Sequence, residues 1–215
     1  GTFQLDATTI GLISSLGFTG FFLALLTAQM LINRTGPEAP VLAGLASATL
    51  GMGLVAAAPA LPVLGAGVFF ASASAGFAWT PFNDAVHRKI RDTDRATALS
   101  EISTGTSLGI ALAGAAALAM VYTGISWRIL WALFALAAAG ALVANWAALR
   151  QVEKSAEAPP PRNWRALCQI AILPMLAAGF ALGTSSAIYI SFAGRHFAEA
   201  GGVAGLPAAA TPGAV

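Results

Sequence analysis

Long apolar runs alternate with short polar joints along most of this chain. A helix needs about 20 mostly apolar residues to cross the hydrocarbon core of a bilayer. Six runs come close to or exceed this length, at 7–32, 41–58, 61–86, 98–122, 126–149 and 166–192. The second run is the shortest and could also form a buried helix of a soluble protein, but its neighbours favour a spanning helix. The pattern predicts an all-α, polytopic transmembrane bundle of six helices.

Capping and turn residues stand at the ends of these runs. Asp6 lies where an N-cap would open the first helix. The other short joints contain residues typical of helix ends, namely Gly36, Pro37, Pro40, Pro59, Pro62, Thr123 and Gly124. One joint is longer, because residues 151–163 are polar and include three consecutive prolines. This composition predicts a flexible linker between two helical bundles.

Small residues recur at four-residue spacing inside several runs. Such rows let helix backbones approach closely, which stabilises helix pairs where lipid provides no hydrophobic drive between them. We expect close helix contacts at Gly20, Ala24 and Ala28, at Ser47 and Gly51, and at Gly105 and Gly109.

The composition agrees with a membrane protein. Hydrophobic residues make up 57% of the 215 residues, charged residues only 9%, and the mean hydropathy is +0.76. The net charge is +2, but the basic residues are thinly spread between apolar runs, so we expect no nucleic-acid partner. The single cysteine, Cys168, excludes an internal disulfide framework and a cysteine-built metal site. We expect no cofactor and no metal.

The basic residues are unevenly divided between the two sides that the six runs define. Nine of the eleven Lys and Arg residues fall on one side, and only Arg128 and Arg195 fall on the other. Loops rich in Lys and Arg stay in the cytoplasm. The division predicts cytoplasmic loops at 33–40, 87–97 and 150–165 in a multi-pass protein of the cell inner membrane.

Polar residues form a stripe along the third run. Its members follow helical spacing and are Ser72, Gly76, Thr80, Asn83 and His87, with Trp79 at the margin. Polar groups avoid lipid, so the stripe faces either a solute cavity or a neighbouring helix that it bonds, with Pro81 kinking the helix. In the last run, Ser185 and Tyr189 share a face with the same two interpretations. Our candidate cavity residues are Trp79, Thr80, Asn83, Ser185 and Tyr189.

Charged residues near the cytoplasmic ends of the helices form a second candidate group. Asp84 is the acidic residue nearest the membrane interior, and Arg34 and Arg88 are available as partners. An intramembrane carboxylate needs such a partner. A gating ion pair is the favoured role, with proton carriage as the alternative. Glu101 is a similar candidate and could pair with Arg95.

Residues 105–109 match the G-x-S-x-G pattern of serine hydrolases. That pattern works on a strained turn between a strand and a helix, whereas here it lies in an apolar helical run. A serine nucleophile also needs a nearby base, and the two histidines, His87 and His196, lie near opposite membrane surfaces. We expect no enzyme. An intramembrane serine hydrolase of the rhomboid type and a non-transporting membrane subunit are kept as alternatives.

Residues 31–40, LINRTGPEAP, resemble the loop between spans two and three of the major facilitator superfamily, commonly written G-x-L-a-D-R-x-G-R-R/K. Leu31, Arg34 and Gly36 match that pattern. The chain departs from it at four positions, Gln29, Asn33, Pro37 and Glu38. Residues 94–100, DRATALS, are similar to the family's loop that leads into span five, and the segment around Gly76 is similar to its span four.

The resemblance implies that the chain covers spans two to seven of a twelve-span fold. Residues 1–150 would then complete the N-terminal half, 151–163 form the cytoplasmic linker, and 164–215 begin the C-terminal half. It further implies a secondary active transporter for a small organic solute such as a sugar, metabolite or drug, usually proton-coupled and working by alternating access. Within the superfamily, the sequence most resembles bacterial sugar-efflux-like and uncharacterised members. We expect a fragment of a protein that is monomeric at full length.

Overall fold

The computed structural model describes residue 3, residues 5–89 and 93–149, and residues 181 and 185. The chain divides into two units, residues 1–11 with 157–215, and residues 12–156. All helix contacts described below lie within the second unit. The predicted linker at 151–163 and the predicted sixth span at 166–192, apart from positions 181 and 185, lie outside the described residues.

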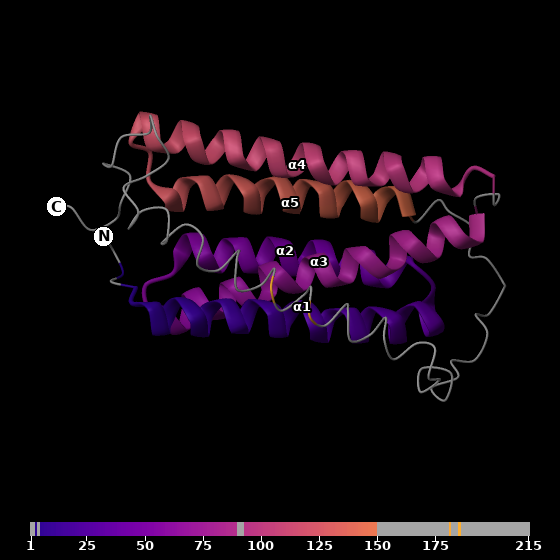
Figure 1. Cartoon of the computed structure of the whole chain (residues 1–215), viewed down its shortest axis with the longest axis horizontal. Coiled ribbons are helices and arrows are strands. Elements are labelled where there is room, and N and C mark those ends of the chain that lie inside the picture. The colour runs from indigo at the N-terminus through magenta and orange to yellow at the C-terminus, as the bar shows by residue number, and fades with distance from the viewer. Residues whose placement is uncertain (1–2, 4, 90–92, 150–180, 182–184, 186–215) are drawn as a thin grey trace. The chain divides into compact units, whose positions relative to one another are not determined.

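Five long helices account for the described part of the chain (Figure 1). They are α1 (Ala7–Thr35), α2 (Glu38–Ala57), α3 (Leu61–Lys89), α4 (Arg95–Thr123) and α5 (Trp127–Leu149). Each contains a stretch long and apolar enough to cross a membrane. The predicted all-helical membrane bundle is confirmed for these five of the six predicted spans.

The helix ends follow the capping residues seen in the sequence. The Asp6 carboxylate accepts a hydrogen bond from the Thr9 backbone N–H at 2.8 Å, which confirms the predicted N-cap. Gly36 and Gly124 follow the last residues of α1 and α4 and adopt φ of 79° and 68°. Only glycine enters this left-handed region without cost, so both helices end there.

Helices α1 and α3 touch through their glycines. A Cβ built on Gly17 would lie 2.9 Å from the Ser72 hydroxyl oxygen, and a Cβ on Gly76 would lie 2.9 Å from the Ala24 Cβ. On α1, Ala24 and Ala28 are 3% and 0% exposed. The close contact predicted along this face of α1 is confirmed, and it needs residues no larger than alanine.

Helices α2 and α3 are antiparallel and approach each other as closely as α1 and α3 do. A Cβ on Gly51 would lie 2.8 Å from the Ala71 Cα and from the Gly67 carbonyl oxygen. A Cβ on Gly67 would in turn lie 2.7 Å from a Val55 methyl group. Helix α3 is therefore held between α1 and α2, and we call α1, α2 and α3 from Leu12 onward the three-helix core.

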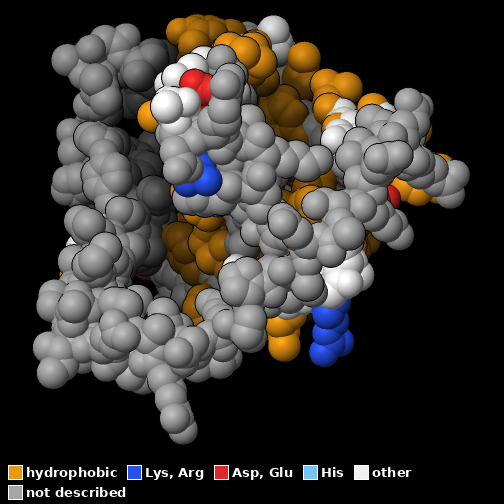
Figure 2. All heavy atoms as spheres, turned by 90° about the vertical axis from the view of Figure 1, so that its right-hand side faces the viewer, with side chains coloured by type: hydrophobic (Ala, Val, Ile, Leu, Met, Phe, Trp, Pro, Cys, Tyr) orange, Lys and Arg blue, Asp and Glu red, His pale blue; other side chains and the backbone are white. Residues whose placement is uncertain are grey.

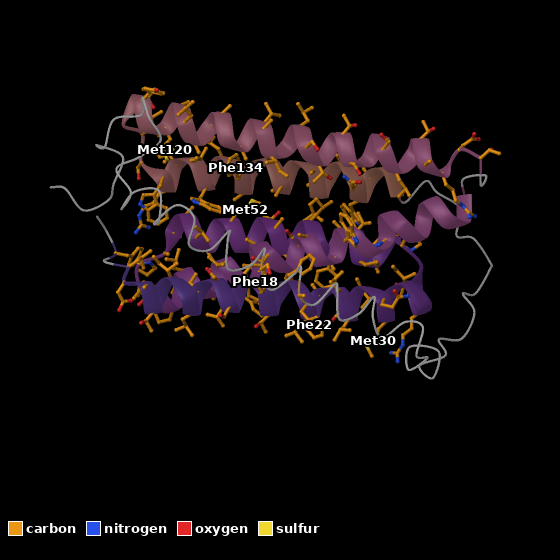
Figure 3. The ribbon with its side chains drawn as sticks, viewed as in Figure 1. Phe18, Phe22, Met30, Met52, Met120 and Phe134 are labelled. Carbon is orange, nitrogen blue, oxygen red and sulfur yellow. The ribbon has the colours of Figure 1, made fainter. Side chains whose placement is uncertain are left out.

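Large apolar side chains cover the outside of this core. Phe18, Phe22 and Met30 lie along α1 and are 43%, 58% and 62% exposed (Figure 3). Seen from one end of the helices, the coloured side chains are mainly hydrophobic, with few basic or acidic ones among them (Figure 2). Small residues inside and large apolar residues outside are the arrangement expected for a protein whose solvent is lipid.

Helix α4 differs from the sequence prediction. No described atom lies within 4 Å of a Cβ built on Gly105 or Gly109, so the small residues of α4 do not form the predicted close contact within the described part of the chain. Its large side chains are also exposed, including Leu108 at 59% and Ile110 at 69%. Four-residue spacing alone does not decide which glycine row meets another helix.

Helix α5 packs along α2, its neighbour in space although not in sequence. The Arg128 guanidinium donates hydrogen bonds to the backbone carbonyls of Ala56, at 3.0 Å, and of Ala58, at 2.7 Å. Ala56 lies in the last turn of α2 and Ala58 is its C-cap residue, where a helix leaves its carbonyl acceptors unpaired. Arg128 therefore ties the start of α5 to the end of α2.

Candidate functional site

The first residues of the polar stripe of α3 pack against another helix. Ser72 and Gly76 face α1, where the Ser72 hydroxyl lies beside Gly17 and Gly76 lies beside Ala24. Both residues thus follow the packing interpretation rather than the cavity interpretation. The first part of the stripe therefore helps to position α3 against α1.

Trp79 lies outside these contacts. Its side chain is 64% exposed, whereas Pro81, two residues later, is fully buried within α3. The helix continues through Pro81 to Lys89, although the proline ring removes one backbone hydrogen bond there. The exposed Trp79 indole therefore lies on α3 close to the point where Pro81 removes one backbone hydrogen bond.

The other candidate cavity residues are described only in part. The backbone of α3 includes Thr80 and Asn83, but their side chains lie outside the described residues. Ser185 is helical and exposed, and Tyr189 lies outside the described residues. A cavity formed by these residues stays a prediction.

The charged candidates lie near the ends of α1 and α3. Arg34 is exposed in the last turn of α1, where a cation stabilises the negative end of the helix dipole. Gly76 of α3 faces Ala24 of α1, so facing positions differ by 76 minus 24, or 52, and position 84 is level with position 32. The side chains of Asp84, Arg88 and Glu101 are not described. The register therefore brings the backbones of Arg34 and Asp84 to within two residues, or about 3 Å, of the same depth.

Ser107, the central serine of the G-x-S-x-G match, lies in the regular part of α4. Its hydroxyl donates a hydrogen bond to the Ser103 carbonyl at 3.0 Å, one helical turn earlier. A nucleophile elbow needs a serine on a sharp turn, hydrogen-bonded to a base. In the described part of the chain this serine lies on a regular helix rather than on a sharp turn. Within the described residues, no group of three His, Cys, Asp or Glu side chains could hold a metal ion.

A groove between α2 and α5 was not anticipated from the sequence. It has a volume of about 640 Å³ and is lined by Thr49, Gly53, Ala56, Ala57, Arg128, Ile129, Ala132, Ala135, Leu136 and Ala139. Arg128 also lies over the Trp127 ring, with its guanidinium carbon 4.8 Å from the ring centroid. The only signal in the sequence was the isolation of Arg128 on the side poor in basic residues.

The comparisons with known proteins identify one family. The family model of the Major Facilitator Superfamily matches residues 1–214, nearly the whole chain. No curated protein matches the chain, and no solved structure matches it. The match agrees with the loop sequence at residues 31–40 and with the five apolar helices of a multi-pass membrane protein. The chain therefore belongs to the major facilitator superfamily of membrane transporters.

Proposed function

We propose that this chain is part of a secondary active transporter that moves a small organic solute by alternating access, coupled to protons. The observation that carries the proposal is the division of α3 into two parts. Ser72 and Gly76 are fixed against α1, whereas Trp79 is exposed beyond that contact. In this scheme the first part anchors the helix and the second part lines the solute path.

The close packing of the three-helix core supports the alternating-access part of the proposal. Transporters of this kind work by rocking one helix bundle against another around a central site. Such rocking needs bundles that do not deform internally. Contacts between backbones, as at Gly51 and Gly76, leave little room for sliding.

The aromatic and polar residues of the proposed site suit an uncharged, hydroxyl-bearing solute. A Trp79 indole provides a flat apolar surface and one N–H donor, and Thr80 and Asn83 would add hydroxyl and amide groups. Asp84, one residue beyond Asn83, is the proposed proton carrier or gate residue. Arg34 is its proposed partner, and the contact of Gly76 with Ala24, which puts position 84 within two residues of the level of position 34, supports this pairing.

Flux measurements on the protein in its complete form test this function. Reconstituted into liposomes with an imposed pH gradient, it should accumulate or expel at least one sugar, polyol or related metabolite from a panel. Collapsing the gradient with a protonophore should abolish net movement against the concentration gradient. Trp79→Ala should lower the rate about tenfold and change the melting temperature little, because this side chain is largely exposed.

Two results would contradict the proposal. Accumulation that persists at full rate without the pH gradient would exclude proton coupling. Flux through Trp79→Ala equal to that of the wild type would exclude the exposed part of α3 as the solute path.

A further inference from the structure

The groove between α2 and α5 combines an apolar channel with one cation at its end. Eight of its ten lining residues are glycine, alanine, isoleucine or leucine, and the exceptions are Thr49 and Arg128. Arg128 stands in the first turn of α5, where the membrane-spanning stretch begins. We propose that this groove binds an anionic phospholipid, with an acyl chain along the groove and the lipid phosphate at Arg128.

The length of the groove fits one leaflet of a bilayer. Along α5 it extends from Arg128 to Ala139, and the 11 residue steps (139 minus 128) correspond to about 16 Å of helix. The hydrocarbon core of a bilayer is about 30 Å thick, so one leaflet contributes about 15 Å. An acyl chain that starts at the interface would therefore end close to the end of the groove.

Arg128 is suited to hold an anion at the interface. Two of the five guanidinium N–H groups bond the carbonyls of Ala56 and Ala58, and these acceptors are neutral, so they do not cancel the positive charge. The half-buried Trp127 packs against the same guanidinium, and Trp residues concentrate at the membrane interface. The carbonyl bonds fix the guanidinium in place, so a lipid phosphate can bind it at little additional entropic cost.

The small side chains of the groove explain why lipid, rather than another helix, is the proposed occupant. Ala132, Ala135 and Ala139 leave a continuous depression along α5 that opens to the surface, and Gly53 continues it on α2. The depression is open along its length and its lining is almost entirely apolar, so a flexible acyl chain can enter it from the bilayer and follow it.

Native mass spectrometry of the full chain with added lipid tests the proposal. The wild type should bind phosphatidylglycerol more tightly than phosphatidylcholine. Arg128→Gln should lower the affinity for phosphatidylglycerol about fivefold and abolish the preference, since one Arg near an anionic surface contributes roughly that factor. Arg128→Lys should keep the preference, because the charge remains. This variant distinguishes loss of charge from loss of the carbonyl bonds to α2.

A second variant fills the groove without touching Arg128. A Cβ on Gly53 meets no described atom within 4 Å, so Gly53→Leu should fold and should lower the affinity for both lipids several-fold. Gly114→Leu on α4 is the matched control, because Gly114 is equally open and lies outside the groove, and its lipid affinity should be unchanged. Circular dichroism confirms that each variant is helical.

Three outcomes would overturn the inference. The first is equal binding of the two lipids by the wild type. The second is an unchanged lipid affinity in Gly53→Leu. The third is a dimer that dissociates in Gly53→Leu, which would mean that a second copy of the chain occupies the groove. Each outcome can occur whether or not the proposed solute transport is correct.

Discussion

Replacement of Gly51 by alanine should destabilise the protein by about 2 kcal/mol, which corresponds to a fall in melting temperature of roughly 5 °C. The new Cβ would lie 2.8 Å from the Ala71 Cα and from the Gly67 carbonyl oxygen. These are backbone atoms, so relief requires α2 and α3 to move apart along their whole contact. Thermal unfolding of the detergent-solubilised protein, followed by size-exclusion chromatography, measures the loss.

Gly53 is the matched control for this experiment, because it lies on the same helix two residues later. A Cβ there meets no described atom within 4 Å. Gly53→Ala should leave the melting temperature unchanged or raise it slightly, since alanine favours the helix more than glycine does. Equal destabilisation by both substitutions would show that α2 and α3 are not held by close backbone contact.

Reversal of the charge at Arg34 or at Asp84 should lower solute flux at least tenfold. Each single variant, Arg34→Asp or Asp84→Arg, would place two like charges at nearly the same depth of α1 and α3. Such a pair repels and leaves a charge uncompensated at the membrane edge, at a cost of more than about 1.4 kcal/mol, or a factor of ten. The flux assay in liposomes measures both variants.

The double variant Arg34→Asp with Asp84→Arg is the decisive comparison. If the two side chains pair, exchanging them restores the attraction, and flux should recover to within a few-fold of the wild type. Flux that stays as low as in the single variants would exclude the pair. Full activity in both single variants would exclude any gating role for these charges.

Helix number and position could be predicted for the described part of the chain because membrane helices obey a simple length rule. The starts predicted for α1 and α3, at residues 7 and 61, agree with the structure. The start of α2 lies at Glu38, before the predicted residue 41, because the apolar run excludes the polar first turn of the helix. Length and hydropathy locate the part of a helix that lies in lipid. The capping residues determine where the helix begins and ends outside that part.

Helix pairing could not be predicted in the same way. The spacing of small residues looks alike in Gly20 to Ala28 and in Gly105 to Gly109, yet only the first row lies against another helix in the described part of the chain. The contact of α2 with α5 joins segments about 70 residues apart in sequence, as the bonds of Arg128 to Ala56 and Ala58 show. The residue pattern of a single sequence does not indicate which of its helices will pack together.

The polar stripe shows the same limit at the candidate site. Its spacing placed Ser72, Gly76 and Thr80 on one face, but the pattern could not separate a packing contact from a cavity wall. The structure resolves Ser72 and Gly76 as packing residues because Gly17 and Ala24 of α1 lie against them. Trp79, which the pattern put at the margin of the stripe, is 64% exposed.

The central claim is that the Trp79 side of α3 faces water inside the membrane rather than lipid. It can be tested without knowledge of the solute, by reacting Trp79→Cys, in a Cys168→Ser background, with a charged thiol reagent that does not cross membranes. Ala46→Cys is the control, because Ala46 is exposed on α2 about one helical turn from the level of Trp79, and Leu50, one turn further along that helix, is 49% exposed. The account predicts labelling at position 79 and none at position 46. An unreactive cysteine at 79, or equal labelling at both positions, would contradict it.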